Sequence, residues 1–137
     1  MINKILFLDF DGVLHPSIST EFFTRLDVLW SAIQHSPPQI VISSSWRFQH
    51  PTRKLKQFLG PNIGKHVIGT TGEAFIGKYA RHEEIKQWIA LDGCTDWAIL
   101  DDSRFEFPEN LPRLILCDAR TGMTQEKADE LKSWLDF

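Results

Sequence analysis

Residues 5–14 read Ile-Leu-Phe-Leu-Asp-Phe-Asp-Gly-Val-Leu. The apolar start predicts a buried strand that ends on a carboxylate, and the glycine after the second carboxylate can adopt backbone angles that other residues resist. Two carboxylates at the end of a buried strand repel each other unless a cation or a proton lies between them. In open α/β sheets this end of the strand is also where ligands bind. The pattern suits a nucleophilic Asp9, an acid/base partner Asp11 and a magnesium ion. The alternative is a hydrogen-bonded acidic turn that Asp11 caps.

The bulk properties indicate one small globular domain spanning residues 1–137. The chain has 137 residues, of which 42% are hydrophobic, enough for one packed core. Its cysteines, Cys94 and Cys117, match no metal or redox spacing, and Cys117 lies in an apolar run. The first apolar run is too short for a signal sequence, and no stretch approaches a membrane span. We therefore expect a cytoplasmic protein with no membrane partner.

Strand-like and helix-like patterns alternate along the whole chain. Alternation of this kind predicts an α/β fold: a single Rossmann-like, doubly wound sheet of about five parallel strands with helices on both faces. Apolar runs place the strands at 4–9, 39–43, 66–69, 97–101 and 113–118. Amphipathic stripes place helices at 22–33, 85–89 and 128–135, and a shorter helix at 52–59 that Gly60-Pro61 ends. The tryptophans in these stripes are expected in the core.

The second predicted strand ends in hydroxyls. Ser43, Ser44 and Ser45 follow it directly, with Trp46 and Arg47 after them. Hydroxyls at the carboxyl end of a strand can donate to a phosphate oxygen, together with nearby backbone amides. The alternative is that one hydroxyl only caps the next helix.

The fourth predicted strand ends in a second acidic pair, Asp101-Asp102. Burying more negative charge beside Asp9 and Asp11 requires a divalent cation nearby. Magnesium prefers hard oxygen ligands and keeps several waters, so a few carboxylates are sufficient. The first and fourth strands are neighbours in many doubly wound sheets. The four aspartates are therefore expected around one ion.

A cation is expected where the third helix begins, within residues 77–85. A basic side chain there would point into the same crevice, bind a phosphate and offset the aspartates. Arg81 is the first choice and Lys78 the reserve. A solvated side chain is the alternative for either residue.

Together these four sites resemble the haloacid dehalogenase (HAD) superfamily of phosphohydrolases. Residues 5–12 resemble the family's first motif, a hydrophobic strand followed by DxDG. Residues 40–44 resemble its second motif, a strand that ends in Ser or Thr. Its Lys or Arg at a helix start corresponds to Arg81 or Lys78. Its strand ending in paired acids is similar to residues 99–102. The phrases Ser-Ser-Trp-Arg, Arg-x-x-Glu-Ile and a late Gly-Met-Thr further resemble the small HAD domains of Swiss-army-knife RNA-repair proteins.

The resemblance implies a magnesium-dependent phosphatase. Asp9 would attack phosphorus to form an aspartyl-phosphate, and Asp11 would protonate the leaving oxygen and then activate water. Ser44, with Ser43 as the alternative, and Arg81 would hold the phosphoryl group. The resemblance implies Mg²⁺ ligands from the Asp9 side chain, the Asp11 backbone carbonyl and Asp102, with Asp101 beside them.

The spacing of the motifs leaves no room for the cap domain that many family members carry. The stretches from Asp11 to Gln39 and from Arg47 to Lys78 must each supply a helix. An open site can admit a phosphate on a large substrate, such as a nucleic-acid end or a phosphoprotein. Residues 47–86 carry a net charge of +5 in a chain of net charge −3, which favours the polyanion. Trp46 and Arg47 are candidate substrate contacts, with Trp46 packed in the core as the alternative.

Two rival functions remain open on the same fold. A phosphoacceptor receiver domain also groups acids around magnesium, but its acceptor aspartate follows the third strand, where this chain has Gly69-Thr70-Thr71. A non-catalytic HAD-fold domain that binds phosphate or a partner would have the same motifs. The presence of all four motifs argues for the enzyme. The sequence does not indicate the oligomeric state.

Overall fold

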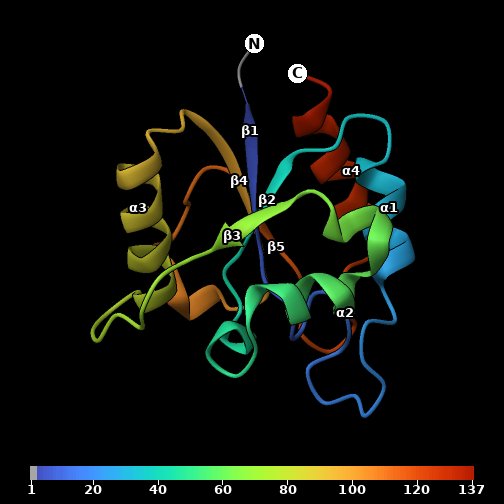
Figure 1. The fold of residues 1–137 in the computed structure, drawn as a ribbon, viewed down its shortest axis with the longest axis horizontal. Coiled ribbons are helices and arrows are strands. Elements are labelled where there is room, and N and C mark those ends of the chain that lie inside the picture. Colours follow the sequence, from blue (N-terminus) through green and yellow to red (C-terminus); the bar gives the residue numbers. More distant parts are fainter. Residues whose placement is uncertain (1–2) are drawn as a thin grey trace.

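The computed structural model describes residues 3–137, which form one five-stranded parallel sheet (Figure 1). The strand order is β3-β2-β1-β4-β5, so the chain runs outward from β1 to one edge and then crosses to the other side of β1. This is the doubly wound arrangement that the alternating pattern predicts. The strands are β1 Lys4–Leu8, β2 Gln39–Ile42, β3 Val67–Thr70, β4 Asp96–Asp101 and β5 Leu114–Leu116.

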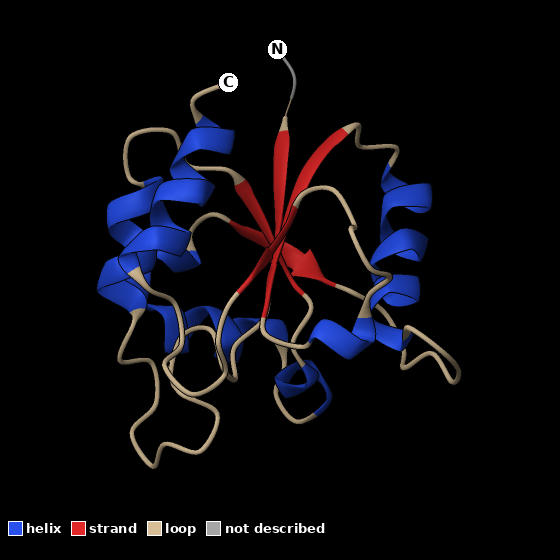
Figure 2. Cartoon of the chain, turned by 180° about the vertical axis from the view of Figure 1, so that it is seen from behind, coloured by secondary structure: helices blue, strands red, loops and turns tan. Residues whose placement is uncertain are grey.

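Helices cover both faces of the sheet, as expected, but unequally. α3 lies alone on one face, whereas α1, α2 and α4 lie on the other (Figures 1 and 2). Loops, rather than a further domain, join β1 to α1 and β3 to α3. The helices are α1 Leu26–Ile33, α2 Thr52–Gly64, α3 Ala80–Asp92 and α4 Gln125–Leu135, with short 3₁₀ turns η1 Ser45–Phe48 and η2 Arg104–Glu106.

The hydrophobic core follows the two-residue period of the strands. On β1, Leu6 and Leu8 pack among the residues of α1, α2 and α4, whereas Ile5 and Phe7 pack toward α3. All four side chains are buried because helices cover both faces, which is why the strand reads as a continuous apolar run. The same alternation on β2 and β4 decides which polar residues meet beyond the strand ends.

The strand ladder continues one residue past β1 and β2. The Asp9 amide donates to the Leu100 carbonyl at 3.0 Å, and the Ser43 amide donates to the Leu8 carbonyl at 3.0 Å. Leu8 pairs with both Ile42 and Leu100, so Asp9, Ser43 and Asp101 lie at one level on three adjacent strands. This edge positions the candidate site.

Two sequence expectations about the helices are wrong. Gly60 adopts φ 81° and ψ 165°, which breaks α2 at the expected place, but Pro61 then begins another helical turn that continues to Gly64. Proline suits a first helical position because its missing amide hydrogen would have no helical partner there. Phe22, expected on the stripe of the first helix, instead lies before α1 in the loop after β1 and is 56% exposed.

Within residues 3–137, no helix is both long and apolar enough to span a membrane.

Candidate active site

Three carboxylates meet at the carboxyl ends of β1 and β4. Oxygens of Asp9, Asp101 and Asp102 lie within 4.8 Å of one another. Asp9 is 4% exposed and Asp101 is fully buried. Gly12 makes this approach possible, because a Cβ there would lie 2.1 Å from the Asp102 Oδ2 atom, and its φ of +75° also favours glycine. Gly12, the glycine of the DxDG motif, therefore leaves the space that the Asp102 side chain occupies.

Burial and mutual repulsion set the electrostatics of this cluster. Burial, followed by the charge of Asp101, raises the pKa of Asp9 well above its usual value, although Arg81 opposes the shift. Burial likewise raises the pKa of Asp101. A bound cation stabilises the charged form of such a carboxylate, because it replaces the lost hydration and offsets the negative charge of the neighbouring acids.

Arg81 supplies the positive charge in this cluster. Its Nη1 atom lies 2.8 Å from Asp101 Oδ2 and 3.3 Å from Asp9 Oδ1, and its side chain is 15% exposed. Burial opposes the charged form, but Asp101 and Asp9 outweigh it and raise the pKa of Arg81. Lys78 is exposed in the loop before α3, with its Nζ 4.9 Å from the Tyr79 ring centroid. The structure thus brings Arg81, and not Lys78, to the aspartates.

The two candidate serines point to different faces of the sheet. Phe7, Val41 and Ile99 pack together on the α3 side of the sheet. Side chains two positions apart along a strand share a face, so Asp9, Ser43 and Asp101, which follow these three residues by two positions, point to that same side. The buried Ser43 hydroxyl has no hydrogen-bond partner among residues 3–137. The Ser44 hydroxyl accepts from the Trp46 amide at 3.2 Å and caps η1. The capping alternative therefore applies to Ser44, and Ser43 replaces it as the first candidate for phosphate binding.

The Asp11 side chain lies outside the carboxylate cluster. Its Oδ1 atom is 2.8 Å from His15 Nε2, and its Oδ2 atom accepts from Trp46 Nε1 at 3.0 Å. Trp46 is half-buried against the core, as its core alternative predicts, yet its indole N–H contacts a candidate catalytic residue. Of the four aspartates expected around one ion, three side chains meet there, and Asp11 turns to other partners.

The Arg47 guanidinium is held within the protein. Nη2 forms a 2.8 Å ion pair with Glu84, Nη1 donates to the carbonyls of Ser43 and Ser44, and Nε donates to the Gly72 carbonyl. The side chain is 3% exposed. The expected substrate contact would require these bonds to break. In this structure Arg47 instead ties the end of β2 to α3 and to the loop after β3.

The sequence motifs gave no role to His15, and Glu84 entered them only as the glutamate of the phrase Arg-x-x-Glu-Ile. His15 is 1% exposed and Glu84 is 7% exposed, and polar groups so buried need partners. Asp11 and His15 are four residues apart, but they lie in a tight turn and not in a helix, so no helical pattern indicates that their side chains meet. In this turn the Gly12 amide donates to the His15 carbonyl at 2.9 Å. No comparable sequence signal separates Ser43 from Ser44, because each lies two residues after an apolar strand residue, Val41 or Ile42.

The donor set fits a hard divalent cation. Asp9, Asp101 and Asp102 offer carboxylate oxygens at close range, and Arg81 alone does not balance their charge. Oxygen-only ligands of this kind suit magnesium rather than zinc or copper.

One comparison with known proteins, that with family models, gives a match, and it agrees with this geometry. Neither the search of curated proteins nor that of solved structures gives a match. Residues 5–128 match a family model described as the HAD domain in Swiss Army Knife RNA repair proteins. The match covers both acidic strand ends, the serines and Arg81, and the observed parallel sheet is consistent with a HAD Rossmann-like fold. The chain belongs to this family of HAD domains.

Proposed function

We propose that this protein is a magnesium-dependent phosphohydrolase that works through an aspartyl-phosphate intermediate. Family membership supports phosphohydrolase chemistry in general. The observation that supports the specific mechanism is the position of Asp9. It is a buried carboxylate directly after the central strand, 3.3 Å from Arg81, within a cluster suited to a divalent cation. A negatively charged nucleophile can approach a phosphate only where positive charge surrounds both groups.

The residues of the site then divide the steps of the reaction among them. An oxygen of Asp9 attacks phosphorus while Asp11 gives its proton to the leaving oxygen, and in the second step Asp11 takes a proton from the water that attacks the aspartyl-phosphate. The Ser43 hydroxyl and the Arg81 guanidinium hold the phosphoryl oxygens. Asp9, Asp102 and the Asp11 backbone carbonyl would hold Mg²⁺ beside Asp101. When bound, the ion neutralises charge on the transferring phosphoryl group.

Loss of one metal ligand should separate metal binding from folding. Asp102→Ala is expected to raise the Mg²⁺ concentration for half-maximal hydrolysis of an aryl phosphate by at least about tenfold, or to abolish the activity. Without metal, the variant should melt at a higher temperature than wild type, because one of three crowded negative charges is gone. Magnesium titrations of activity, with melting curves in a chelator, measure both effects. An unchanged magnesium requirement would remove Asp102 from the site.

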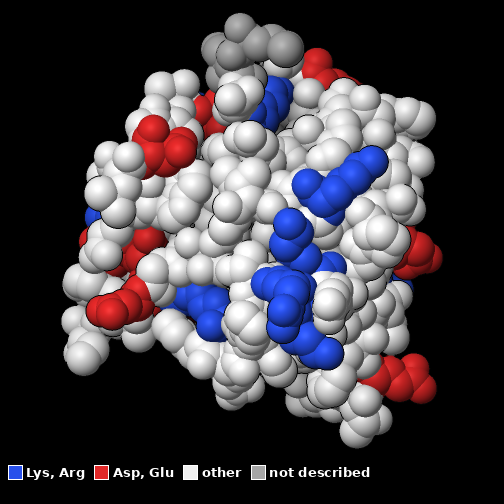
Figure 3. All heavy atoms as spheres, viewed as in Figure 1, with Lys and Arg blue, Asp and Glu red and all other residues white. Residues whose placement is uncertain are grey.

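For the substrate, we propose a phosphate at the end of a nucleic acid. The matched family is described as a domain of RNA repair proteins, and α2 adds a feature of this chain. No acidic residue lies between Asp27 and Glu73, although Arg47, Arg53, Lys54, Lys56 and Lys65 do. Figure 3 shows basic side chains gathered where Figure 1 places α2. Such a surface attracts phosphate chains without reading their sequence.

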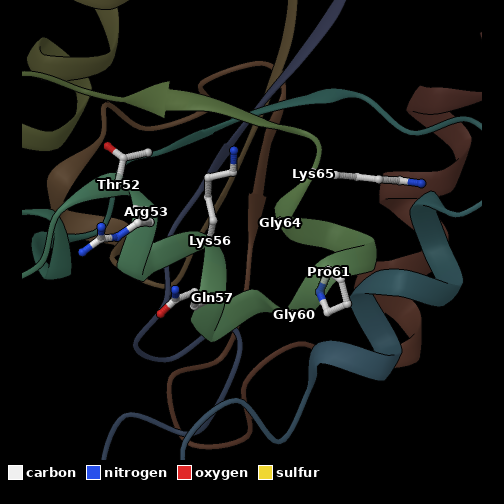
Figure 4. A pocket seen from close by; sticks show the side chains of 8 residues that line it. All are labelled: Thr52, Arg53, Lys56, Gln57, Gly60, Pro61, Gly64 and Lys65. Carbon is white, nitrogen blue, oxygen red and sulfur yellow. The ribbon is translucent and has the colours of Figure 1, made fainter.

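A groove along α2 is the place where a strand would lie. It has a volume of about 750 Å³, and its basic lining residues are Arg53, Lys56 and Lys65. Figure 4 shows Arg53 and Lys56 on α2 and Lys65 just after its end, spaced apart rather than converging on one point. This spacing suits successive phosphates better than a single one. α2 begins four residues after η1, which Ser44 caps, so one end of the groove lies near the site edge. Within residues 3–137, these three form no ion pair.

Salt dependence should distinguish a nucleic-acid substrate from a small one. Activity on a terminally phosphorylated oligonucleotide is expected to fall much more steeply with rising salt than activity on an aryl phosphate. Arg53→Gln/Lys56→Gln should flatten the oligonucleotide curve, because two phosphate contacts are lost. Lys86→Gln/Lys132→Gln, which removes the same charge from α3 and α4, is the matched control.

The outcome also decides between the alternatives. Parallel salt curves for both substrates would contradict the nucleic-acid proposal, and a phosphopeptide assayed beside them tests the phosphoprotein alternative. Binding of phosphate or oligonucleotide without turnover of any substrate would favour a non-catalytic HAD-fold domain.

A further inference from the structure

Two side chains hold the carboxyl group of Asp11 from both sides. His15 Nε2 lies 2.8 Å from Oδ1, and Trp46 Nε1 donates to Oδ2 at 3.0 Å. His15 comes from the turn after β1 and Trp46 from η1. We call this pair the Asp11 clamp. Asp11 itself is about half exposed, with 48% of its side chain accessible, so its carboxyl group would rotate freely without these contacts.

The hydrogen-bond network assigns His15 as a donor to Asp11. The Phe23 amide donates to His15 Nδ1 at 3.1 Å, so Nδ1 is an acceptor and the ring proton is on Nε2, facing Asp11. His15 is 1% exposed, and its ring makes edge contacts with those of Phe22 and Phe23. A second ring proton would displace the Phe23 amide. The clamp therefore consists of two neutral donors in fixed orientations.

The backbone around the clamp is specialised for these contacts. Phe23 has a φ of 60°, which non-glycine residues rarely adopt, and this conformation accompanies its amide contact to the imidazole. The Phe23 ring stacks on Phe58 and contacts Trp46 edge-on, with centroids 5.6 and 5.3 Å apart. Strain of this kind persists only where surrounding packing overrides it, and it is concentrated at functional sites.

We propose that His15 and Trp46 are positioning residues for the leaving-group step of the hydrolysis. The inference rests on the proposed function, in which Asp11 is the general acid and base. The clamp uses one lone pair of each Asp11 oxygen and leaves another for the transferred proton. In the first step that proton moves to the leaving oxygen as its bond to phosphorus breaks and the Asp9–phosphorus bond forms. In the second, water gives a proton to Asp11 as its oxygen displaces Asp9.

A positioned acid matters most for a poor leaving group. A nitrophenolate leaves without protonation, whereas an alkoxide requires the proton in the transition state. His15→Leu is therefore expected to lower kcat/KM for an alkyl phosphate by about 10²-fold, and that for nitrophenyl phosphate by less than about tenfold. The ratio kcat/KM is the correct measure, because it reports steps up to the first irreversible one and excludes hydrolysis of the intermediate.

Three further variants separate positioning from packing. Trp46→Phe keeps an aromatic ring and removes the N–H, so it should show the same leaving-group bias as His15→Leu. His15→Gln retains a side-chain N–H donor and should recover part of the alkyl phosphate activity. Phe58→Leu loosens the same aromatic cluster without contacting Asp11, so both substrates should change equally.

The activity of the wild-type protein distinguishes failure of the proposed function from failure of the inference about His15 and Trp46. Wild-type protein that hydrolyses neither substrate with magnesium would overturn the proposed function and, with it, this inference. An active wild type with equal losses on both substrates in His15→Leu and Trp46→Phe would overturn the inference alone. If His15→Leu does not fold, Trp46→Phe and His15→Gln carry the test.

Discussion

Asp9→Asn is expected to abolish phosphohydrolase activity, with kcat falling by more than about 10⁴-fold, while the protein stays folded. The amide keeps the size and shape of the side chain, but it cannot form the acyl-phosphate bond. Steady-state assays with an aryl phosphate and magnesium measure the loss. Wild-type protein quenched during turnover should retain label from a ³²P-labelled substrate, whereas the variant should not. Wild-type rates in the variant would contradict the covalent mechanism.

The same substitution should change how stability depends on pH without metal. The pKa of Asp9 is raised in the folded protein, chiefly by burial and secondly by the Asp101 charge. The folded state therefore binds protons more tightly than the unfolded chain, and its stability falls as pH rises from about 4 through the raised pKa. The asparagine of the variant does not titrate, so this dependence is lost. The melting temperature of the variant relative to wild type should thus rise from pH 4 to 7 in a chelator, and a constant difference would contradict this electrostatic account.

Arg47→Ala should destabilise the protein by about 3–5 kcal/mol, because it leaves Glu84 buried without its counter-charge. The ion pair is 2.8 Å long, with the two side chains 3% and 7% exposed, and the second Glu84 oxygen accepts from the Phe75 amide at 3.0 Å. The loss would also remove donors from the carbonyls of Ser43 and Ser44. Urea denaturation measures the free energy of unfolding.

Two controls make this result specific. Arg53→Ala removes an exposed arginine from α2 and should change stability by no more than about 0.5 kcal/mol. Arg47→Met/Glu84→Leu removes both charges and should recover much of the loss, since apolar residues can replace a buried ion pair. An Arg47→Ala variant of unchanged stability but weaker substrate binding would restore the substrate contact expected from the sequence.

The sheet and the positions of the acidic residues at its strand ends were predictable, because short local sequence patterns indicate both. Runs such as Ile5–Leu8 and Ile99–Leu100 are apolar enough to predict buried strands, and Asp9 and Asp101 follow at the points where the apolar runs stop. Parallel strands connected by helices place all their carboxyl ends on one edge. The meeting of these aspartates thus follows from chain order, and the close contacts confirm it for Asp9, Asp101 and Asp102.

Other parts of the candidate site depend on contacts between distant segments. Strand parity decides whether Ser43 or Ser44 faces Asp9. Only the packing of Val41 on the α3 face, and of Ile42 on the face that α1, α2 and α4 cover, resolves that parity. The ion pair between Arg47 and Glu84 joins residues 37 positions apart, and no local pattern specifies such a pair.

The sequence by itself determined the fold class, the family and the aspartates, because hydrophobic periodicity and strand-end motifs are local properties of the chain. Only the tertiary structure decided the use of each polar side chain nearby. Asp11 turns to His15 and Trp46, and Arg81 rather than Lys78 reaches the acids. Burial is the physical reason: a desolvated polar group must find a partner, and the three-dimensional packing determines which partner lies within hydrogen-bonding distance.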